Sequence, residues 1–288
     1  MRRYLYFLGL VLGLVLGQTS AALAADYDFT IIDFPGAPFS ETLGINNVGE
    51  IVGVYVAGPE HGFLLTRDGF STIDVPGADV TNTHAYGINN RGEIVGAYTD
   101  GSGHYHGYLL SDGGFTIIDV PGASDTFARG INNAGQIVGQ YVTANVSHGF
   151  LFSGGTFTTI DVPGGTGAFA YGINAAEQIV GGYNVGGVPY AFVRDRDGTF
   201  TTIAFPGAAT TYGFAINGRG DIVGMYQIVA GGLSHGYVFS AGGFDTVDVP
   251  GAVIGAAHGI NSKGQIVGYF ETGGRRHGFI AVPVQGPQ

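Results

Sequence analysis

Short apolar runs and turn residues alternate along the chain in one repeating order. Each unit begins with a Gly-Ile-Asn step and continues through runs such as residues 50–55, 61–65 and 70–77. These runs are rich in Ile, Val, Phe, Tyr and Thr and are separated by glycine-containing turns, which is typical of β-strands. Outside the N-terminal segment, no window of ten residues shows helical periodicity. We therefore predict four strands per unit and an all-β fold.

The unit occurs six times, at intervals of 42 to 44 residues. Its first strand carries the Gly-Ile-Asn step, which starts at Gly44, Gly87, Gly130, Gly172 and Gly259, with Ala215 beginning a variant copy. One four-stranded blade per repeat of this length is the pattern of a β-propeller. The sequence thus predicts a six-bladed propeller, with an open β-solenoid as the alternative.

The two ends of the chain hold complementary parts of one repeat. The sixth repeat stops after its third strand, at residues 277–280, and has no fourth strand of its own. The missing segment is found at residues 29–36. Pairing of the two would complete the last blade and remove the open sheet edges. In an open solenoid, whose ends do not meet, a repeat divided between the two termini would have no structural role. We therefore predict that the N-terminal strand closes the ring.

The first 24 residues have the layout of a secretory signal peptide. Arginines follow Met1, an apolar run extends over residues 4–17, and Ala22-Leu23-Ala24 forms a cleavage site. The apolar run is shorter than the roughly 20 residues that span a bilayer. We expect cleavage after Ala24, a single repeat domain over residues 25–288, a secreted or periplasmic location, and no membrane insertion of the mature chain.

Composition narrows the range of partners. The net charge is −11, Lys263 is the only lysine, and there is no cysteine. Nucleic acids and anionic lipids attract proteins through Lys and Arg, so we expect neither as a partner. The absence of cysteine excludes disulfides, thiol catalysis and Cys-ligated metals. We expect a monomer with no cofactor and no bound metal.

The repeated motifs resemble those of a known family. The patterns G-I-N-x-x-G-x-I-V-G-x-Y and H-G-F or Y-A-F, over residues 27–283, are similar to the extracellular HAF repeats, named for a His-Ala-Phe step. One difference is that HAF repeats commonly end in a Leu-Gly-Gly type segment, whereas these end in Asp-Val-Pro-Gly-Ala. The resemblance implies export and a repeat fold, and it implies no established activity.

Five of the eight histidines open the third strand of a repeat, and each has an aspartate in a fourth strand. The pairs are His61 with Asp74, His106 with Asp119, His148 with Asp161, His235 with Asp248 and, through ring closure, His277 with Asp33. The fourth repeat has Tyr190 and Ala204 instead, so both partners are missing together. A hydrogen bond between the strands explains this, since a buried partner left alone costs about 1–3 kcal/mol. We predict structural pairs rather than a metal ring.

Three other patterns resemble functional motifs. Residues 232–236 match G-x-S-x-G, but a nucleophile elbow needs a helix after it. Residues 195–198 resemble part of a calcium loop, but they align with the turns between third and fourth strands. An asparagine ends each Gly-Ile-Asn step, and we predict an Asx-type turn rather than a channel lining for all six: Asn46, Asn89, Asn132, Asn174, Asn217 and Asn261.

The residue before Gly-Ile-Asn varies between repeats: Leu43, Tyr86, Arg129, Tyr171, Phe214 and His258. In a propeller this position lies near the channel mouth, on the face shared by the loops between blades and the loops between second and third strands. We predict that a glycan or another small polar ligand binds there, through His84, Arg129, Tyr171, Tyr212, His258 and Arg275. Asp125, Glu60, Tyr105 and Arg276 lie nearby in the sequence pattern. The alternative is that these are ordinary loop residues.

Two classes of function remain open. The favoured interpretation is an exported, non-catalytic binding module for carbohydrate or a cell-surface protein, which rests largely on analogy between propellers. The alternative is a glycan-active hydrolase or lyase at the same face. The sequence shows no paired carboxylates and no His–Tyr set that would identify catalytic residues.

Overall fold

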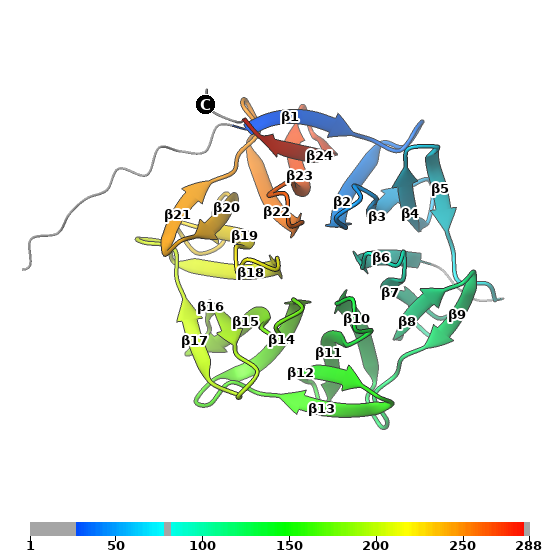
Figure 1. Cartoon of the computed structure of the whole chain (residues 1–288), viewed down its shortest axis with the longest axis vertical. Coiled ribbons are helices and arrows are strands. Elements are labelled where there is room, and N and C mark those ends of the chain that lie inside the picture. Colours follow the sequence, from blue (N-terminus) through cyan, green and yellow to red (C-terminus); the bar gives the residue numbers. More distant parts are fainter. Residues whose placement is uncertain (1–26, 78–81, 285–288) are drawn as a thin grey trace, which may run out of the picture.

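The protein is a ring of six antiparallel four-stranded sheets, which confirms the predicted six-bladed propeller (Figure 1). The computed structural model describes residues 27–77 and 82–284. The predicted signal peptide, residues 1–24, lies outside the described part. No helix in the described ranges is long and apolar enough to cross a membrane.

Within each blade, the strands are given below in order from the channel to the outer rim. Blades 1 to 3 contain β2 (Phe39–Ile45), β3 (Ile51–Val56), β4 (Glu60–Thr66) and β5 (Gly69–Ile73); β6 (Asn82–Ile88), β7 (Ile94–Thr99), β8 (Tyr105–Ser111) and β9 (Gly114–Ile117); and β10 (Asp125–Ile131), β11 (Ile137–Thr143), β12 (Val146–Ser153) and β13 (Thr156–Ile160). Blades 4 and 5 contain β14 (Thr166–Ile173), β15 (Ile179–Val185), β16 (Val188–Arg194) and β17 (Phe200–Ile203); and β18 (Thr210–Ile216), β19 (Ile222–Gln227), β20 (His235–Ser240) and β21 (Gly243–Thr246). Blade 6 contains β22 (Ile254–Ile260), β23 (Ile266–Thr272), β24 (Arg275–Pro283) and β1 (Tyr27–Ile32).

Ring closure occurs as predicted. β1 pairs antiparallel with β24, in a register that runs from Tyr27 opposite Pro283 to Ile32 opposite Gly278. Figure 1 shows the two strands side by side at the outer rim of blade 6. The N-terminal strand therefore supplies the fourth strand that the sixth repeat lacks.

The hydrophobic core lies between neighbouring blades. In one cluster, Val52 and Ile73 of blade 1 pack with Ala85, Ile94 and Tyr108 of blade 2. The other five clusters likewise combine residues of two adjacent blades. Because each blade buries its apolar faces only against its neighbours, the ring as a whole supplies the core.

Glycine is required where strands approach each other most closely. A Cβ atom on Gly53 would lie 1.9 Å from the carbonyl oxygen of Glu41 and 2.7 Å from the ring of Phe63. A Cβ atom on Gly44, near the channel, would lie 2.8 Å from the carbonyl oxygen of Tyr86 in the next blade. These contacts explain in packing terms why glycine occupies the Ile-Val-Gly step in all six repeats and the Gly-Ile-Asn step in five of them, with Ala215 in the other.

The six repeated asparagines make the predicted Asx-type turns and also connect the blades. In blade 1, Asn46 Oδ1 accepts hydrogen bonds from the backbone amides of Val48, Gly49 and Glu50 at 2.9–3.2 Å. Asn46 Nδ2 donates to the backbone carbonyl of Asn89, one blade further, at 3.2 Å. The same bond is repeated around the ring from Asn89, Asn132, Asn174, Asn217 and Asn261, the last of which returns to Asn46. We call this closed circle the asparagine ring, and the end of the channel where it lies the turn face.

All five predicted His–Asp pairs are present, with Nδ1 to carboxylate distances of 2.6–2.9 Å. In the fourth blade the ring of Tyr190 instead lies 6.0 Å from that of Tyr183. The aspartate side chains are 34–55% exposed, so the pairs lie near the surface and the cost expected for a buried pair does not apply. Each histidine also stacks on an aromatic ring of the second strand, as His61 does on Tyr55.

The remaining motif-like segments are turns and loops. Residues 232–236 lie between β19 and β20 and at the start of β20, with no helix after them. Asp195 and Gly198 close the turn between β16 and β17, where the Gly198 amide donates to the Asp195 carbonyl at 2.9 Å. The predicted hairpin turn at residues 195–198 is confirmed, and the helix that a nucleophile elbow needs does not follow residues 232–236.

Candidate functional site

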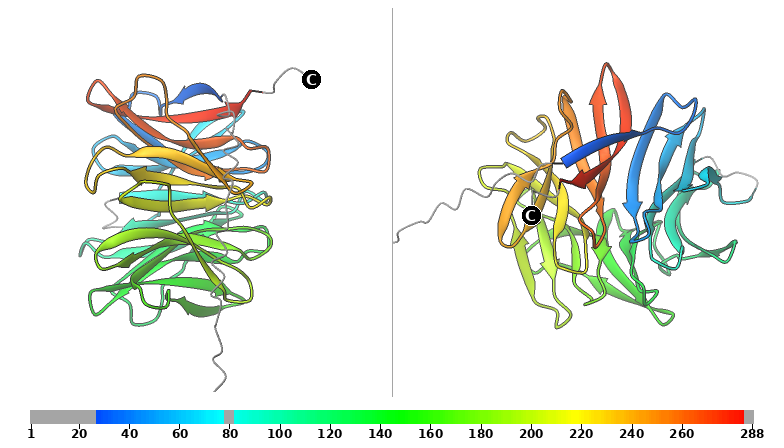
Figure 2. Two further views of the ribbon diagram at one scale, coloured as in Figure 1. Left: turned by 90° about the vertical axis from the view of Figure 1, so that its left-hand side faces the viewer. Right: turned by 45° about the horizontal axis from the view of Figure 1, so that its top comes forward.

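A cavity of about 490 Å³ occupies the channel axis at the end opposite the asparagine ring. We call this end the mouth face; the loops between blades and the loops between second and third strands lie at this end. Figure 2 shows the ring of blades from the side. The floor of the cavity consists of the isoleucines of the Gly-Ile-Asn steps: Ile45, Ile88, Ile131, Ile173, Ile216 and Ile260. Because the asparagine ring lies one residue further along each strand, the cavity ends in an apolar floor backed by hydrogen-bonded amides.

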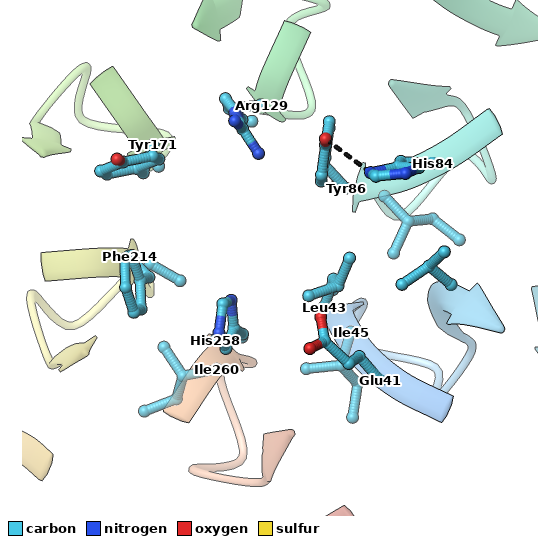
Figure 3. A pocket seen from close by; sticks show the side chains of 18 of the residues that line it. Glu41, Leu43, Ile45, His84, Tyr86, Arg129, Tyr171, Phe214, His258 and Ile260 are labelled. Atoms are coloured by element: carbon cyan, nitrogen blue, oxygen red, sulfur yellow. Dashed lines mark hydrogen bonds between the residues drawn. The ribbon is translucent and has the colours of Figure 1, made fainter. Parts of the chain in front are cut away.

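Above this floor, the six variable residues converge on one opening. All of them line the cavity: Leu43, Tyr86, Arg129, Tyr171, Phe214 and His258. Figure 3 shows their side chains around a common space, with Glu41 at its edge. Of the residues predicted to bind ligand, His84, Arg129, Tyr171 and His258 are brought together here.

Two of the predicted residues do not line the cavity. The ring of Tyr212 packs over Gly182, whose missing side chain leaves space for it, with a Cβ position 3.0 Å from Tyr212 Cδ1. Arg275 is exposed and lines a separate hollow near Pro35 and Pro38. Its neighbour Arg276 reaches the cavity instead, since successive residues of a strand point to opposite sides.

Sequence reasoning missed Glu41, which lies in the cavity wall. The sequence does contain a signal for Glu41, because it occupies the repeat position three residues before Gly44. His84 and Tyr212, which were predicted to bind ligand, occupy the same position before Gly87 and Ala215. The Glu41 carboxylate forms an ion pair with Arg276, which also pairs with Glu271 at 2.5 Å. Burial raises the pKa of Glu41, and the hydrogen bond and charge of Arg276 oppose that rise.

His84 connects two other cavity residues. Its Nε2 lies 2.6 Å from the Glu60 carboxylate and its Nδ1 lies 2.8 Å from the Tyr86 hydroxyl. The hydrogen bond from His84 lowers the pKa of Glu60, whereas burial raises the pKa of Tyr86. With the Glu60 carboxylate accepting from Nε2–H, Nδ1 is free to accept the Tyr86 proton. The structure thus contains a His–Tyr set that the sequence did not reveal.

Arg129 is held by aromatic rings rather than by a carboxylate. The guanidinium carbon lies 4.1 Å from the ring centre of Tyr86, 5.0 Å from that of Phe127 and 5.8 Å from that of Tyr171. Its Nε is buried and has no hydrogen-bond partner within the described residues. Cation–π contacts of this kind orient the guanidinium while leaving its N–H donors unused.

His258 lies in blade 6, across the ring from Arg129 in blade 3. Burial, together with the positive charges of Arg129 and Arg276, lowers the pKa of His258 to about 3. Its ring stacks on Phe214 with centroids 4.5 Å apart. Burial also raises the pKa of Tyr171 to about 12. His258 is therefore a neutral imidazole and Tyr171 a protonated phenol at ordinary pH.

The cavity offers aromatic faces, hydroxyl and imidazole groups, an unpaired guanidinium and two carboxylates, of which Glu41 is paired with Arg276 and Glu60 with His84. Such a combination can bind a small ligand that has both apolar and hydrogen-bonding surfaces, and the volume falls within the roughly 300–1,000 Å³ typical of small-molecule sites. Over residues 27–77 and 82–284, no three His, Asp or Glu side chains come together as ligands for a metal ion.

No protein-family model matches the sequence, and the search of curated proteins gives no match. Several solved propellers have a similar structure. A streptogramin B lyase is 15% identical, with a TM-score of 0.53 over 88% of this chain and 97% of the other. TolB from Acinetobacter baumannii is 14% identical, with a TM-score of 0.56 over 81% and 63%. A six-bladed fungal lectin from Aleuria aurantia is 13% identical, with a TM-score of 0.54 over 87% and 99%. At these identities, the likeness establishes the propeller fold.

Proposed function

We propose that this protein is an exported, HAF-type propeller that binds a sugar in its axial cavity without transforming it. The observation that carries the proposal is the meeting of aromatic faces and hydrogen-bonding groups in one cavity. Tyr171 and Phe214 offer apolar surface to a sugar ring, while Arg129, His258 and Glu60 offer donors and acceptors to its hydroxyls. A fungal lectin of similar fold has been solved in complex with Fucα1-6GlcNAc, which supports sugar binding as a use of this architecture.

The experiment is a glycan array followed by isothermal titration calorimetry on residues 25–288. Tyr171→Ala and Phe214→Ala should each weaken binding of a hit by about 10-fold or more, since each removes an aromatic face. Val48→Ala provides the control, because Val48 is 70% exposed on the turn face. Absence of any sugar ligand, or equal affinity in all three variants, would refute the proposal.

A glycan-active enzyme is the second candidate, and the hydrogen-bonded chain from Glu60 through His84 to Tyr86 favours it. A base oriented by a carboxylate and within reach of a hydroxyl is the arrangement that activates side chains for catalysis. In this interpretation, the Tyr86 oxygen would take a proton from the substrate while its own proton passes to Nδ1 of His84, whose Nε2–H stays hydrogen-bonded to Glu60. The test is product analysis after incubation with any sugar that binds. Turnover that His84→Ala abolishes while binding persists would establish the enzyme and exclude the non-catalytic module.

A further inference from the structure

Two arginines and two glutamates line the cavity, so basic and acidic residues are balanced there, whereas the whole chain contains 22 acidic and 11 basic residues. Five of the eight arginines in the described residues form an ion pair with a carboxylate, among them Arg91 with Glu93, Arg219 with Asp221, and Arg276 with both Glu41 and Glu271. Arg129 has no ion pair among the described residues, although it lines the cavity. The buried Nε without a partner carries a desolvation cost, and no carboxylate of the described residues offsets the positive charge of this guanidinium, which faces the cavity.

The residues around Arg129 leave the N–H groups of its guanidinium available for hydrogen bonds. Tyr86 and Tyr171 belong to the two blades that flank its own, and their rings lie near the guanidinium. Contacts with aromatic rings use none of the hydrogen-bond donors of the guanidinium and so leave its N–H groups for a ligand. That edge presents parallel donors that match the two oxygens of a carboxylate.

The rest of the cavity would orient such an anion. Glu41 and Glu60, on blade 1, would repel it, and both already have a cationic or imidazole partner that leaves further lone pairs free for hydroxyl groups. Near Arg129 the described residues include no opposing carboxylate, and His258 across the opening is neutral. An anionic group is therefore favoured at the Arg129 side and hydroxyl groups at the blade 1 side (Figure 3).

We infer that the cavity recognises an acidic sugar, a uronic acid, whose carboxylate pairs with the Arg129 guanidinium while its ring lies against Tyr171 and Phe214. This inference rests on the proposed sugar binding and specifies the class of sugar. It distinguishes the protein from a binder of neutral sugars, in which Arg129 would donate to hydroxyl groups only and its positive charge would meet no anionic group.

The test compares each uronic acid with its neutral parent: glucuronate with glucose, galacturonate with galactose and mannuronate with mannose, as methyl glycosides. In calorimetry on residues 25–288, at least one uronate should bind about 10-fold or more tightly than its parent, the scale of one charge-assisted contact. Arg129→Gln should abolish that preference, and Arg129→Lys should retain part of it. Arg91→Gln, which removes an ion-paired arginine of the turn face, should change nothing.

The outcomes separate this inference from the proposed function. Equal affinity for acidic and neutral members of every pair would overturn the inference and leave sugar binding standing. A preference that survives Arg129→Gln would overturn the pairing with Arg129. Tighter binding of a sulfated sugar than of the uronate would show that a sulfate, not a carboxylate, is the preferred group. No binding of any sugar would refute both proposals. The melting temperature of Arg129→Gln should not fall, so a loss of preference cannot be ascribed to unfolding.

Discussion

The side-chain amide of Asn261 donates to the backbone carbonyl of Asn46 at 3.1 Å, although the two residues are 215 positions apart. This bond completes the asparagine ring, which joins all six first strands at the turn face. The pairing of β1 with β24 completes the ring at its outer rim. The propeller is therefore closed at two radii, and the cavity on its axis is lined by residues from every blade.

Loss of one asparagine side chain should weaken the entire ring. Asn132 Oδ1 accepts from the amides of Ala134 and Gln136, and its Nδ2 donates to the Asn174 carbonyl. Because the Asn132 side chain is buried and each bond contributes about 1 kcal/mol, Asn132→Ala should lower the free energy of unfolding by about 2–4 kcal/mol. Chemical denaturation measures this change. Asn133→Ala, which removes one exposed bond, should cost well under half as much; equal losses would contradict the role assigned to the ring.

Removal of residues 27–36 should destabilise the whole protein. Without β1, the sixth blade loses its fourth strand and β24 becomes an open edge. We expect a fall of more than about 10 °C in melting temperature, or no cooperative transition, since several kcal/mol of pairing and packing are lost. Asp33→Ala is the matched control, because it keeps the strand and removes only the exposed partner of His277. A truncated chain that melts within about 2 °C of the intact one would disprove strand exchange.

The His106–Asp119 pair should make stability depend on pH. Burial opposes protonation of His106, but the hydrogen bonds and charges of Asp119 and Asp100 outweigh it and raise the pKa above 6.5. A raised histidine pKa stabilises the fold fully below pH 6.5, and this contribution is lost as pH rises through the folded-state pKa. The pair is partly exposed, so its contribution stays below about 1 kcal/mol. The unfolding free energy of the wild type relative to Asp119→Asn should thus be larger at about pH 5 than at about pH 9; a constant difference would exclude this linkage.

The neutral state of His258 should respond to Arg129. Burial is the main cause of its low pKa, and the charge of Arg129 is the next. In Arg129→Gln, an NMR titration should therefore show a pKa above about 3 but still below the ordinary 6.5, since burial persists. Arg91→Gln should leave the titration unchanged. An identical His258 pKa in the wild type and Arg129→Gln would show that the two groups do not share the cavity.

The fold was largely predictable because its signals are local and repeated. The repeat divided between residues 29–36 and 277–280 predicts the β1–β24 pairing. The fourth repeat has Tyr190 in place of histidine and Ala204 in place of aspartate, and this simultaneous replacement predicts the His–Asp pairs. The asparagine turns were also predictable, since each turn lies within one repeat. Their bonds to the next blade were not, because these depend on the distance between neighbouring first strands at the axis.

The site was only partly predictable. The variable position before Gly-Ile-Asn correctly indicated which side chains line the opening. Arg275 was chosen where Arg276 reaches the cavity, because the sequence does not show on which side of β24 each residue lies. The fit of Tyr212 over Gly182 depends on the absence of a side chain in another blade, and the sequence of one repeat carries no sign of it.

The most direct test of sugar binding in the axial cavity is a crystal structure of residues 25–288 with the sugar that binds most tightly. The sugar should lie above the six isoleucines, within hydrogen-bond distance of Arg129 and against the ring of Tyr171. A sugar found at the turn face, or in a groove on the outer surface between blades, would contradict it.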